Sequence, residues 1–184
     1  MKFSSKHENI PEDEWVWGRE TLVWGYEADH AYTLKILAPK VGREGCLSLQ
    51  YHHQKSETWF VLSGQIWALM IQSGQIITRV MSKGDFQNLP TGTVHRMMAI
   101  TEDAKVLESS TPDRHAADKS LPKDVVRLHC VHGRDCEEYE APEGRLLVEK
   151  AILVTEEAIR QVELGHIPIE DGLDLLEGGS KINF

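Results

Sequence analysis

The sequence has little cysteine, no surplus of positive charge and no long hydrophobic run. Its three cysteines, Cys46, Cys130 and Cys136, are an odd number in a chain of 184 residues, which argues against a disulfide framework and favours reduced thiols. Lys and Arg number 20 against 29 Asp and Glu, giving a net charge of -9, so neither nucleic acid nor an anionic membrane is an expected partner. No apolar run approaches the roughly 20 residues of a membrane span, and the first residues lack the apolar middle of a secretion signal. A cytoplasmic location is therefore expected.

What is present is typical of one soluble globular domain. The chain is 41% hydrophobic and 27% charged, which is too mixed for a disordered protein. Residues 1–14 are polar and are interpreted as an N-terminal arm. The amino-acid composition changes again after Pro112. We therefore expect a main domain over residues 15–134 and a C-terminal extension over residues 135–184.

Short β-rich runs separated by turn residues fill the first two thirds of the chain. They recur every 8 to 12 residues or so, which is the pattern of an antiparallel sandwich or barrel. The expected strands cover residues 20–26, 31–38, 47–52, 58–63, 65–71, 75–81, 93–100, 105–109 and 124–128. Trp59 and Trp67 are interpreted as packing residues of these strands.

The extension carries the only helical signals. Thr155 precedes two glutamates in the manner of a helix N-cap, apolar residues follow at helical spacing, and Gly165 is the expected stop. A second short helix is expected over residues 169–176, after Pro168. We predict a small helical hairpin that packs on the β domain and has a structural role.

Four side chains in two stretches could together bind a divalent metal. Gln50 and His52 are two residues apart on an expected strand, so they point to the same face. Glu57 follows closely, and His95 comes after a Pro and Gly turn that can lead the chain into a new strand. Amide oxygen, imidazole nitrogen and carboxylate are all metal donors.

These ligands sit in two spaced motifs that resemble those of the cupin superfamily. The motifs combine ligands with turn residues, as Gln50-x-His52-x4-Glu57-x6-Gly64 and Gly84-x5-Pro90-x-Gly92-x2-His95. The flanking sequence resembles the phosphomannose isomerase branch of cupins, in the stretches SLQYHHQKSETW, ESSTP, DVVR and HGR. That branch includes the isomerase half of enzymes that also carry a guanylyltransferase. The resemblance covers about Trp15 to Arg134. No nucleotidyltransferase domain is recognised in this chain.

The resemblance implies an antiparallel jelly-roll β-barrel, mainly β, that holds one divalent metal on Gln50, His52, Glu57 and His95. Zinc is the usual metal of this branch and is expected here, with manganese or iron as alternatives. Glutamine is usual at the first ligand position of the isomerases, whereas many iron-dependent cupin dioxygenases have histidine there. Gln50 therefore favours Lewis-acid chemistry over oxygen activation.

The function implied is a metal-dependent aldose–ketose isomerase that acts on a sugar or sugar phosphate by proton transfer through an enediol. Glu108 and Lys35 are the candidate catalytic residues, and Lys55 and Lys35 are the candidate substrate-binding residues. A lysine in mid-strand faces either solvent or a polar cavity, and for Lys35 the solvated face is favoured. A non-catalytic sugar-binding cupin and a cupin dioxygenase are the alternatives. The family and the edge-strand problem also favour a homodimer.

For two other features we prefer a structural role to a functional one. Strand alternation turns Arg96 away from the metal face, so a structural ion pair is expected for it. The cluster formed by His129, Cys130, His132 and Cys136 contains zinc-binding residue types, but its spacing is not that of a standard finger or ribbon. A second metal site is therefore not expected.

Overall fold

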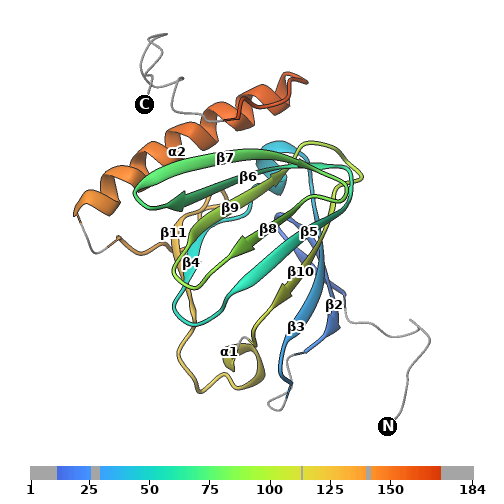
Figure 1. Ribbon diagram of the computed structural model, residues 1–184, viewed down its shortest axis with the longest axis vertical. Helices are drawn as coiled ribbons and strands as arrows, with labels where there is room; N and C mark the ends of the chain where they lie inside the picture. Colours follow the sequence, from blue (N-terminus) through green and yellow to red (C-terminus); the bar gives the residue numbers. More distant parts are fainter. Residues whose placement is uncertain (1–11, 26–29, 113, 140–141, 171–184) are drawn as a thin grey trace.

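The computed structural model describes residues 12–25, 30–112, 114–139 and 142–170, and its strands form two antiparallel sheets (Figure 1). The six-stranded sheet has the order β1 (Glu12–Trp15), β2 (Gly18–Trp24), β3 (Thr33–Pro39), β10 (Lys105–Ser110), β5 (Glu57–Ser63) and β8 (Phe86–Leu89). The five-stranded sheet has the order β11 (Val125–His129), β4 (Leu49–His52), β9 (Val94–Ala99), β6 (Gln65–Gln72) and β7 (Gln75–Ser82). A 3-10 turn, η1 (Gly42–Gly45), and two helices, α1 (Arg114–Ala117) and α2 (Pro142–Glu163), complete the structure.

The two sheets face each other, and the chain passes repeatedly from one to the other. Consecutive strands such as β4, β5 and β6 alternate between the sheets, and every strand pair is antiparallel. A buried cluster that includes Leu37, Trp59 and Met97 fills the space between them. The expected mainly β, antiparallel architecture of the jelly-roll class is therefore confirmed.

Strand alternation decides which residues enter the interior. In β3, Thr33, Lys35 and Leu37 are buried, while Leu34 and Ile36 between them are partly exposed. Lys35 thus faces the interior, so the solvated position favoured from the sequence is wrong. Lys35 therefore places a charged group in the interior.

Helix α2 covers the outer face of the five-stranded sheet. Its residues Ala151, Val154, Ala158 and Val162 are buried in a second cluster with sheet residues such as Trp67. Their spacing of three and four residues makes one continuous apolar stripe along the helix. The extension is thus held to the β domain by a hydrophobic core of its own.

The helix begins earlier than the sequence reading placed it. Thr155 is inside α2, where its Oγ1 donates a hydrogen bond of 2.7 Å to the Ala151 carbonyl, so the expected N-cap role is wrong. The expected stop is confirmed, because Gly165 has φ 78° and its N–H and that of His166 bond back to Val162 and Gln161 in a Schellman-type cap. Of the second expected helix, residues 169 and 170 are not helical and residues 171–176 lie outside the described residues.

Two short strands were not expected. β1 falls at the end of the predicted N-terminal arm, whose first 11 residues lie outside the described part, and β8 lies inside the second motif. The stretch between the strands expected over residues 105–109 and 124–128 includes the single-turn helix α1. None of the described helices combines the length and the apolar character needed to cross a bilayer.

Candidate metal centre

Three strands bring the candidate ligands together between the sheets. His52 ends β4, Glu57 begins β5 and His95 lies in β9, and one ligand atom from each lies within 4.8 Å of the others. All three side chains are buried, at 3–6% exposure. Gln50 is opposite His95 in the β4–β9 register, so it shares a sheet face with His95 and, two residues along the strand, with His52.

The histidines are oriented in the way that metal-binding imidazoles usually are. Nδ1 of His95 donates a hydrogen bond of 2.8 Å to the Thr93 carbonyl, and Nδ1 of His52 lies 3.2 Å from Oδ2 of Asp124. An oxygen partner at one ring nitrogen leaves the other free to bind a metal. Nε2 of His52 is buried without a hydrogen-bond partner, and Nε2 of His95 lies 2.8 Å from Oε1 of Glu57. These donors fit a divalent cation.

The electrostatics hold two of the candidate ligands, His52 and Glu57, in their metal-binding protonation states. Burial, followed by the nearby Lys55 charge, lowers the pKa of His52 to about 4, so this imidazole is neutral at pH 7. Burial alone would raise the pKa of Glu57, but Lys55 and His95 outweigh it and hold the pKa well below the ordinary value. A neutral imidazole and an ionised carboxylate are the forms that bind metals.

Lys55 lies between the candidate metal ligands and the candidate catalytic residue Glu108. Its Nζ lies 2.6 Å from Oε2 of Glu57 and 2.9 Å from Oε1 of Glu108, and all three side chains are buried. Burial opposes the ammonium charge, yet the two carboxylates outweigh it and raise the pKa of Lys55. Burial and the charge of Glu57 raise the pKa of Glu108, and Lys55 partly offsets them. The lysine expected to bind substrate is therefore also the bridge between two acids.

Lys35 lies beside Glu108 on β3, the strand next to β10 in the same sheet. It is opposite Glu108 in the β3–β10 register, and its Nζ lies 3.2 Å from Oε1 of Glu20. The candidate catalytic residues Glu108 and Lys35 are thus neighbours inside the protein. Glu20 is a partner that the sequence analysis did not assign.

Asp124 is the site residue that the sequence reasoning missed. Its carboxylate accepts hydrogen bonds from the backbone N–H groups of Gln54 (2.7 Å) and Lys55 (3.0 Å), in addition to its contact with His52. It stands directly before β11, whose Val125 pairs with His52. Asp124 begins the DVVR stretch that carries part of the family resemblance, but the stretch alone assigned it no role, because that role depends on this strand pairing.

The other residues singled out from the sequence lie elsewhere. Arg96 is buried and follows the inward-facing His95, so it points away from the metal face as expected. Its Nη2 hydrogen-bonds to the ring and the carbonyl of His129, both at 2.9 Å, and no ion pair is found for it in the described part of the chain. Within the described residues, His52, Glu57 and His95 form the one group close enough to hold a metal. Trp59 and Trp67 are buried packing residues.

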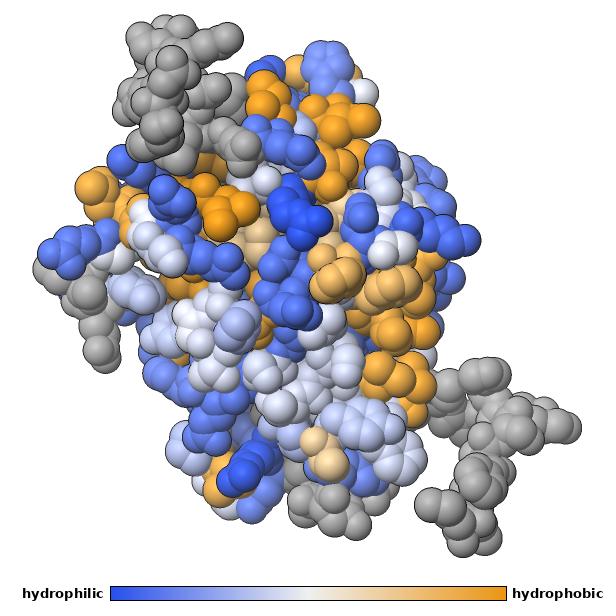
Figure 2. Space-filling model, viewed as in Figure 1, coloured by the Kyte–Doolittle hydropathy of each residue, from blue (hydrophilic) through white to orange (hydrophobic). Residues whose placement is uncertain are grey.

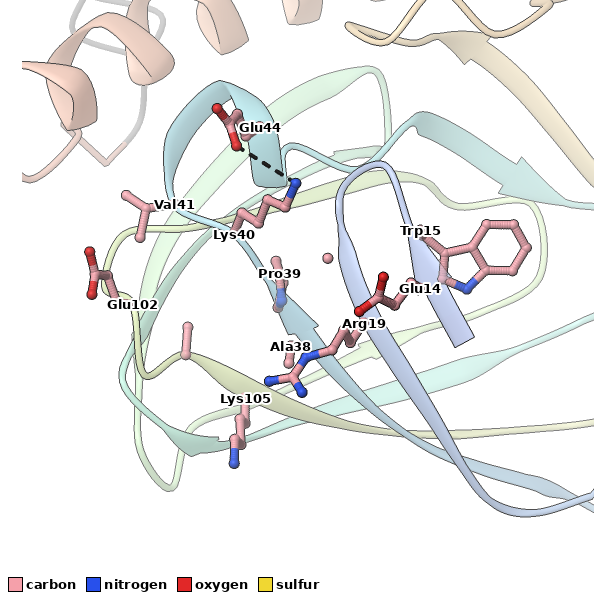
Figure 3. A pocket seen from close by; sticks show the side chains of 12 residues that line it. Glu14, Trp15, Arg19, Ala38, Pro39, Lys40, Val41, Glu44, Glu102 and Lys105 are labelled. Carbon is pink, nitrogen blue, oxygen red and sulfur yellow. Dashed lines mark ion pairs between the residues drawn. The ribbon is translucent and has the colours of Figure 1, made fainter. Parts of the chain in front are cut away.

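Two surface pockets differ in their relation to this centre. A pocket of ≈ 500 Å³ reaches Glu57 and is otherwise walled by residues such as Tyr32, Thr58 and Ser110. A second pocket of ≈ 610 Å³ shares no residue with the metal cluster (Figure 3). Its wall carries three basic and three acidic side chains: Arg19, Lys40, Lys105, Glu14, Glu44 and Glu102. This balance favours no ligand of one charge, so the first pocket is the one relevant to the site.

Comparison with known proteins gives one family match. The profile of the family described as mannose-6-phosphate isomerase C-terminal matches residues 6–106, which is more than half of the chain. No curated protein matches the sequence at a significant level.

Several solved structures are similar to this one. Oxalate decarboxylase from Bacillus subtilis at pH 4.6 superposes with a TM-score of 0.50 and 15% identity over 65% of this chain and 30% of that one. The capsular polysaccharide assembling protein CapF from Staphylococcus aureus gives 0.48 and 18% over 59% of this chain and 30% of that one. KdgF from Halomonas sp. gives 0.48 and 18% over 65% and 98%. The chain thus spans only 30% of the length of the first two proteins.

Proposed function

The chain belongs to the mannose-6-phosphate isomerase C-terminal family of cupins, and on this basis we propose that it is a metal-dependent isomerase that interconverts an aldose and a ketose, with a sugar or a sugar phosphate as substrate. One observation carries the proposal. A cluster of three metal-binding side chains lies next to a buried carboxylate, Glu108, with a raised pKa. This reaction needs a Lewis acid and a proton-transfer group side by side.

The metal would be held by His52, Glu57 and His95, with the amide oxygen of Gln50 as a further ligand. A neutral amide, two imidazoles and a carboxylate suit zinc and also manganese or iron. Bound there, such an ion would act as a Lewis acid toward the sugar carbonyl oxygen. At neutral pH His52 is a neutral imidazole and Glu57 an ionised carboxylate, which supports this assignment.

Glu108 is proposed as the base that moves the carbon-bound proton. It would take the proton from C2 of the aldose and return it to C1 of the enediol, while a second proton passes between the two oxygens. Its raised pKa supports this role, because a general base works best when its pKa is close to the operating pH. Lys55, at 2.9 Å from Oε1, would keep the carboxylate in one orientation.

Lys35 is proposed to bind substrate oxygen. It faces the interior opposite Glu108 and carries a positive charge next to Glu20, so a sugar hydroxyl or a phosphate bound beside Glu108 could contact it. Lys55 is the other proposed binding group, and a substrate would compete there with the two carboxylates that its Nζ contacts.

That same contact favours a second candidate function, a sugar-binding cupin without catalysis. A base that stays paired with Lys55 would not abstract a proton, whereas a polar interior could still bind a sugar. Turnover separates the two candidates, because both predict sugar binding and only the isomerase predicts a change of the sugar.

The test is an incubation of the zinc, manganese and iron forms, after metal analysis, with mannose 6-phosphate, fructose 6-phosphate, mannose and fructose. We expect interconversion of one aldose–ketose pair. Glu108→Gln should lower turnover by about 10²–10⁴ with unchanged metal content, while the matched control Glu102→Gln, at an exposed acid, should behave as wild type. No turnover by any metal form would rule out the isomerase.

A further inference from the structure

The segment that follows β11 brings thiols and arginines together at one edge of the five-stranded sheet. It turns at Gly133, whose N–H donates to the Cys130 carbonyl at 3.2 Å, and it returns so that the Glu137 N–H bonds to the Arg127 carbonyl at 2.7 Å. Figure 2 shows a largely hydrophilic surface on the left of the molecule, where Figure 1 places β11 and this segment. Cys136 is exposed there, so small polar molecules can reach the segment.

One arginine contacts both cysteines of this segment. Nε of Arg134 donates to Sγ of Cys130 at 3.2 Å, and its Nη2 donates to Oγ of Ser48 at 2.7 Å. Nε of Arg127 donates to the same hydroxyl oxygen at 3.0 Å. Sγ of Cys136 donates to the Arg134 carbonyl at 3.2 Å. Arg134 thus has one thiol at its side chain and the other at its backbone.

The arginines around these thiols lack acidic partners. No ion pair is found for Arg127 or Arg134 in the described part of the chain, and their side chains bond to neutral oxygens and to sulfur. Arg96 is 1% exposed, and its Nε and Nη1 have no hydrogen-bond partner. The acid that affects Arg96 most, Glu156, is paired with Arg43. Because a buried guanidinium without an anion is costly, this cluster favours a negative charge on a neighbouring thiol.

Cys130 is the thiol best placed to carry that charge. Burial raises its pKa, but hydrogen bonds from Arg134, from neighbouring backbone N–H groups and from Ser48 outweigh burial and bring the pKa to about 7. Burial also raises the pKa of Cys46 and of Cys136, and the charges of nearby arginines do not outweigh it there. Near pH 7 about half of Cys130 is therefore thiolate, the form of cysteine that attacks electrophiles.

The geometry argues against a metal ion in this cluster. His129 and His132 add imidazoles to the two cysteines. Their ligand atoms do not come within metal-binding reach of one another, however, because in the described part of the chain only His52, Glu57 and His95 form such a group. The unpaired arginines would also repel a cation. The cluster therefore fits the chemistry of an anionic thiol.

We propose that Cys130 is a peroxide-reactive thiol and that Cys136 completes its oxidation to an intramolecular disulfide. The Cys130 thiolate attacks one oxygen of hydrogen peroxide, the O–O bond breaks, a sulfenic acid forms, and the hydroxide released takes up a proton and leaves as water. The Cys136 sulfur then attacks the sulfenic sulfur, the S–O bond breaks, and the thiol proton leaves with that oxygen as a second water. Two thiols lose two electrons, and one peroxide is reduced to two waters.

The surrounding side chains suit both steps. The N–H groups of Arg134 lie beside the reacting sulfur, where they can stabilise the negative charge that develops on the leaving oxygen. Cys136 is exposed and lies across one short turn from Cys130, so closing the bridge moves only a surface segment. Cys46 is 0% exposed within the hydrophobic cluster under α2, so its approach to Cys130 would disturb the core.

The test is treatment of the full chain with hydrogen peroxide at pH 7, followed by mass spectrometry without reduction. The protein is loaded with zinc, which has no redox chemistry, and freed of excess metal. Wild type should form a bridge between Cys130 and Cys136. Cys136→Ser should stop at a sulfenic acid that dimedone traps on Cys130, and Cys130→Ser should leave Cys136 reduced. The matched control Cys46→Ala should behave as wild type.

Arg134→Leu tests the activation of the thiol. At pH 7 an ordinary thiol with a pKa of about 8.5 is roughly 3% thiolate, which is a loss of roughly 16-fold, and its greater nucleophilicity recovers about fivefold. Sulfenic acid formation in this variant should therefore slow at least about threefold. The control Arg160→Leu, at an exposed arginine of α2, should leave the rate unchanged.

Circular dichroism establishes that each variant is folded, and Arg134→Lys replaces Arg134→Leu if the latter does not fold. Oxidation of Cys130 no faster than that of free cysteine in the same solution would overturn the proposal. A bridge from Cys130 to Cys46 or to a second chain would also overturn it, as would equal rates with and without the Arg134 side chain. None of these results depends on sugar turnover, so the isomerase proposal stands or fails separately.

Discussion

Replacing Lys55 by methionine should strongly destabilise the metal-free protein. Lys55 is the ammonium group between Glu57 and Glu108, at 2.6 and 2.9 Å, and both carboxylates are 5–6% exposed. Methionine leaves two buried acids without their shared cation, and breaking a buried ion pair in this way costs about 3–5 kcal/mol. Urea denaturation at pH 7.5 with a chelator present measures the loss in the free energy of unfolding.

The loss should shrink at low pH. Lys55 helps to hold the folded-state pKa of Glu57 below its ordinary value of 4.5, so the stability from this carboxylate is present above about pH 4.5 and disappears as pH falls through the folded pKa. In the variant the buried acids protonate more easily, which removes their penalty. The gap in the free energy of unfolding between wild type and Lys55→Met should therefore narrow as the pH falls toward 4.5, and narrow further below it.

Two comparisons make this prediction specific. Lys105→Met removes an exposed lysine for which no ion pair is found among the described residues, and should change stability by less than about 0.5 kcal/mol. Adding zinc should restore part of the stability of Lys55→Met, because a bound cation neutralises Glu57. A loss below about 1 kcal/mol in the metal-free variant would refute the role given to the lysine.

Three further predictions concern other parts of the molecule. Gly64→Ala should destabilise the protein more than Gly74→Ala, as measured by thermal unfolding. Both glycines have positive φ, but of the two only Gly64 would bring a Cβ against backbone atoms, at 2.7 Å. Equal losses of stability would contradict this. At pH 7.5 Cys130 should react with iodoacetamide before the more exposed Cys136, as followed by mass spectrometry. Burial raises the pKa of both thiols, but hydrogen bonds from a neighbouring arginine bring that of Cys130 to about 7; earlier labelling of Cys136 would count against it. Asp124→Ala should weaken zinc binding about 10–100-fold by calorimetry, as expected for the partner of a ligand histidine, and unchanged affinity would exclude that role.

The sheets could be predicted from the sequence because their signal is local. Strand alternation and regular turn residues gave the antiparallel class and most of the strands. β8 was missed because four residues between two turn motifs carry too little periodicity. The start of α2 was misplaced because a threonine before two glutamates looks like a cap, whereas the stripe of buried residues runs on both sides of Thr155. Only packing against the sheet reveals that stripe.

The candidate metal ligands were also within reach of the sequence, and their partners were not. Residue spacing along β4 puts Gln50 and His52 on one face, and the resemblance to the cupin motifs predicts that His52, Glu57 and His95 converge, as they do. The contact between Lys55 and Glu108 joins residues 53 positions apart, and it depends on the register between β5 and β10. The interior position of Lys35 depended on which face of β3 is buried, which the neighbouring residues left open.

The most direct test of the proposed chemistry is proton exchange at the sugar carbons. The metal-loaded protein is incubated in D₂O with the aldose–ketose pairs mannose and fructose, free and 6-phosphorylated, and deuterium at C1 and C2 is followed by NMR. We predict that wild type introduces solvent deuterium into one pair and that Glu108→Gln, with equal metal content, does so about 10²–10⁴ times more slowly. No deuterium in any sugar with wild type, or equal exchange by Glu108→Gln, would contradict an isomerase in which Glu108 is the base beside a metal held by His52, Glu57 and His95.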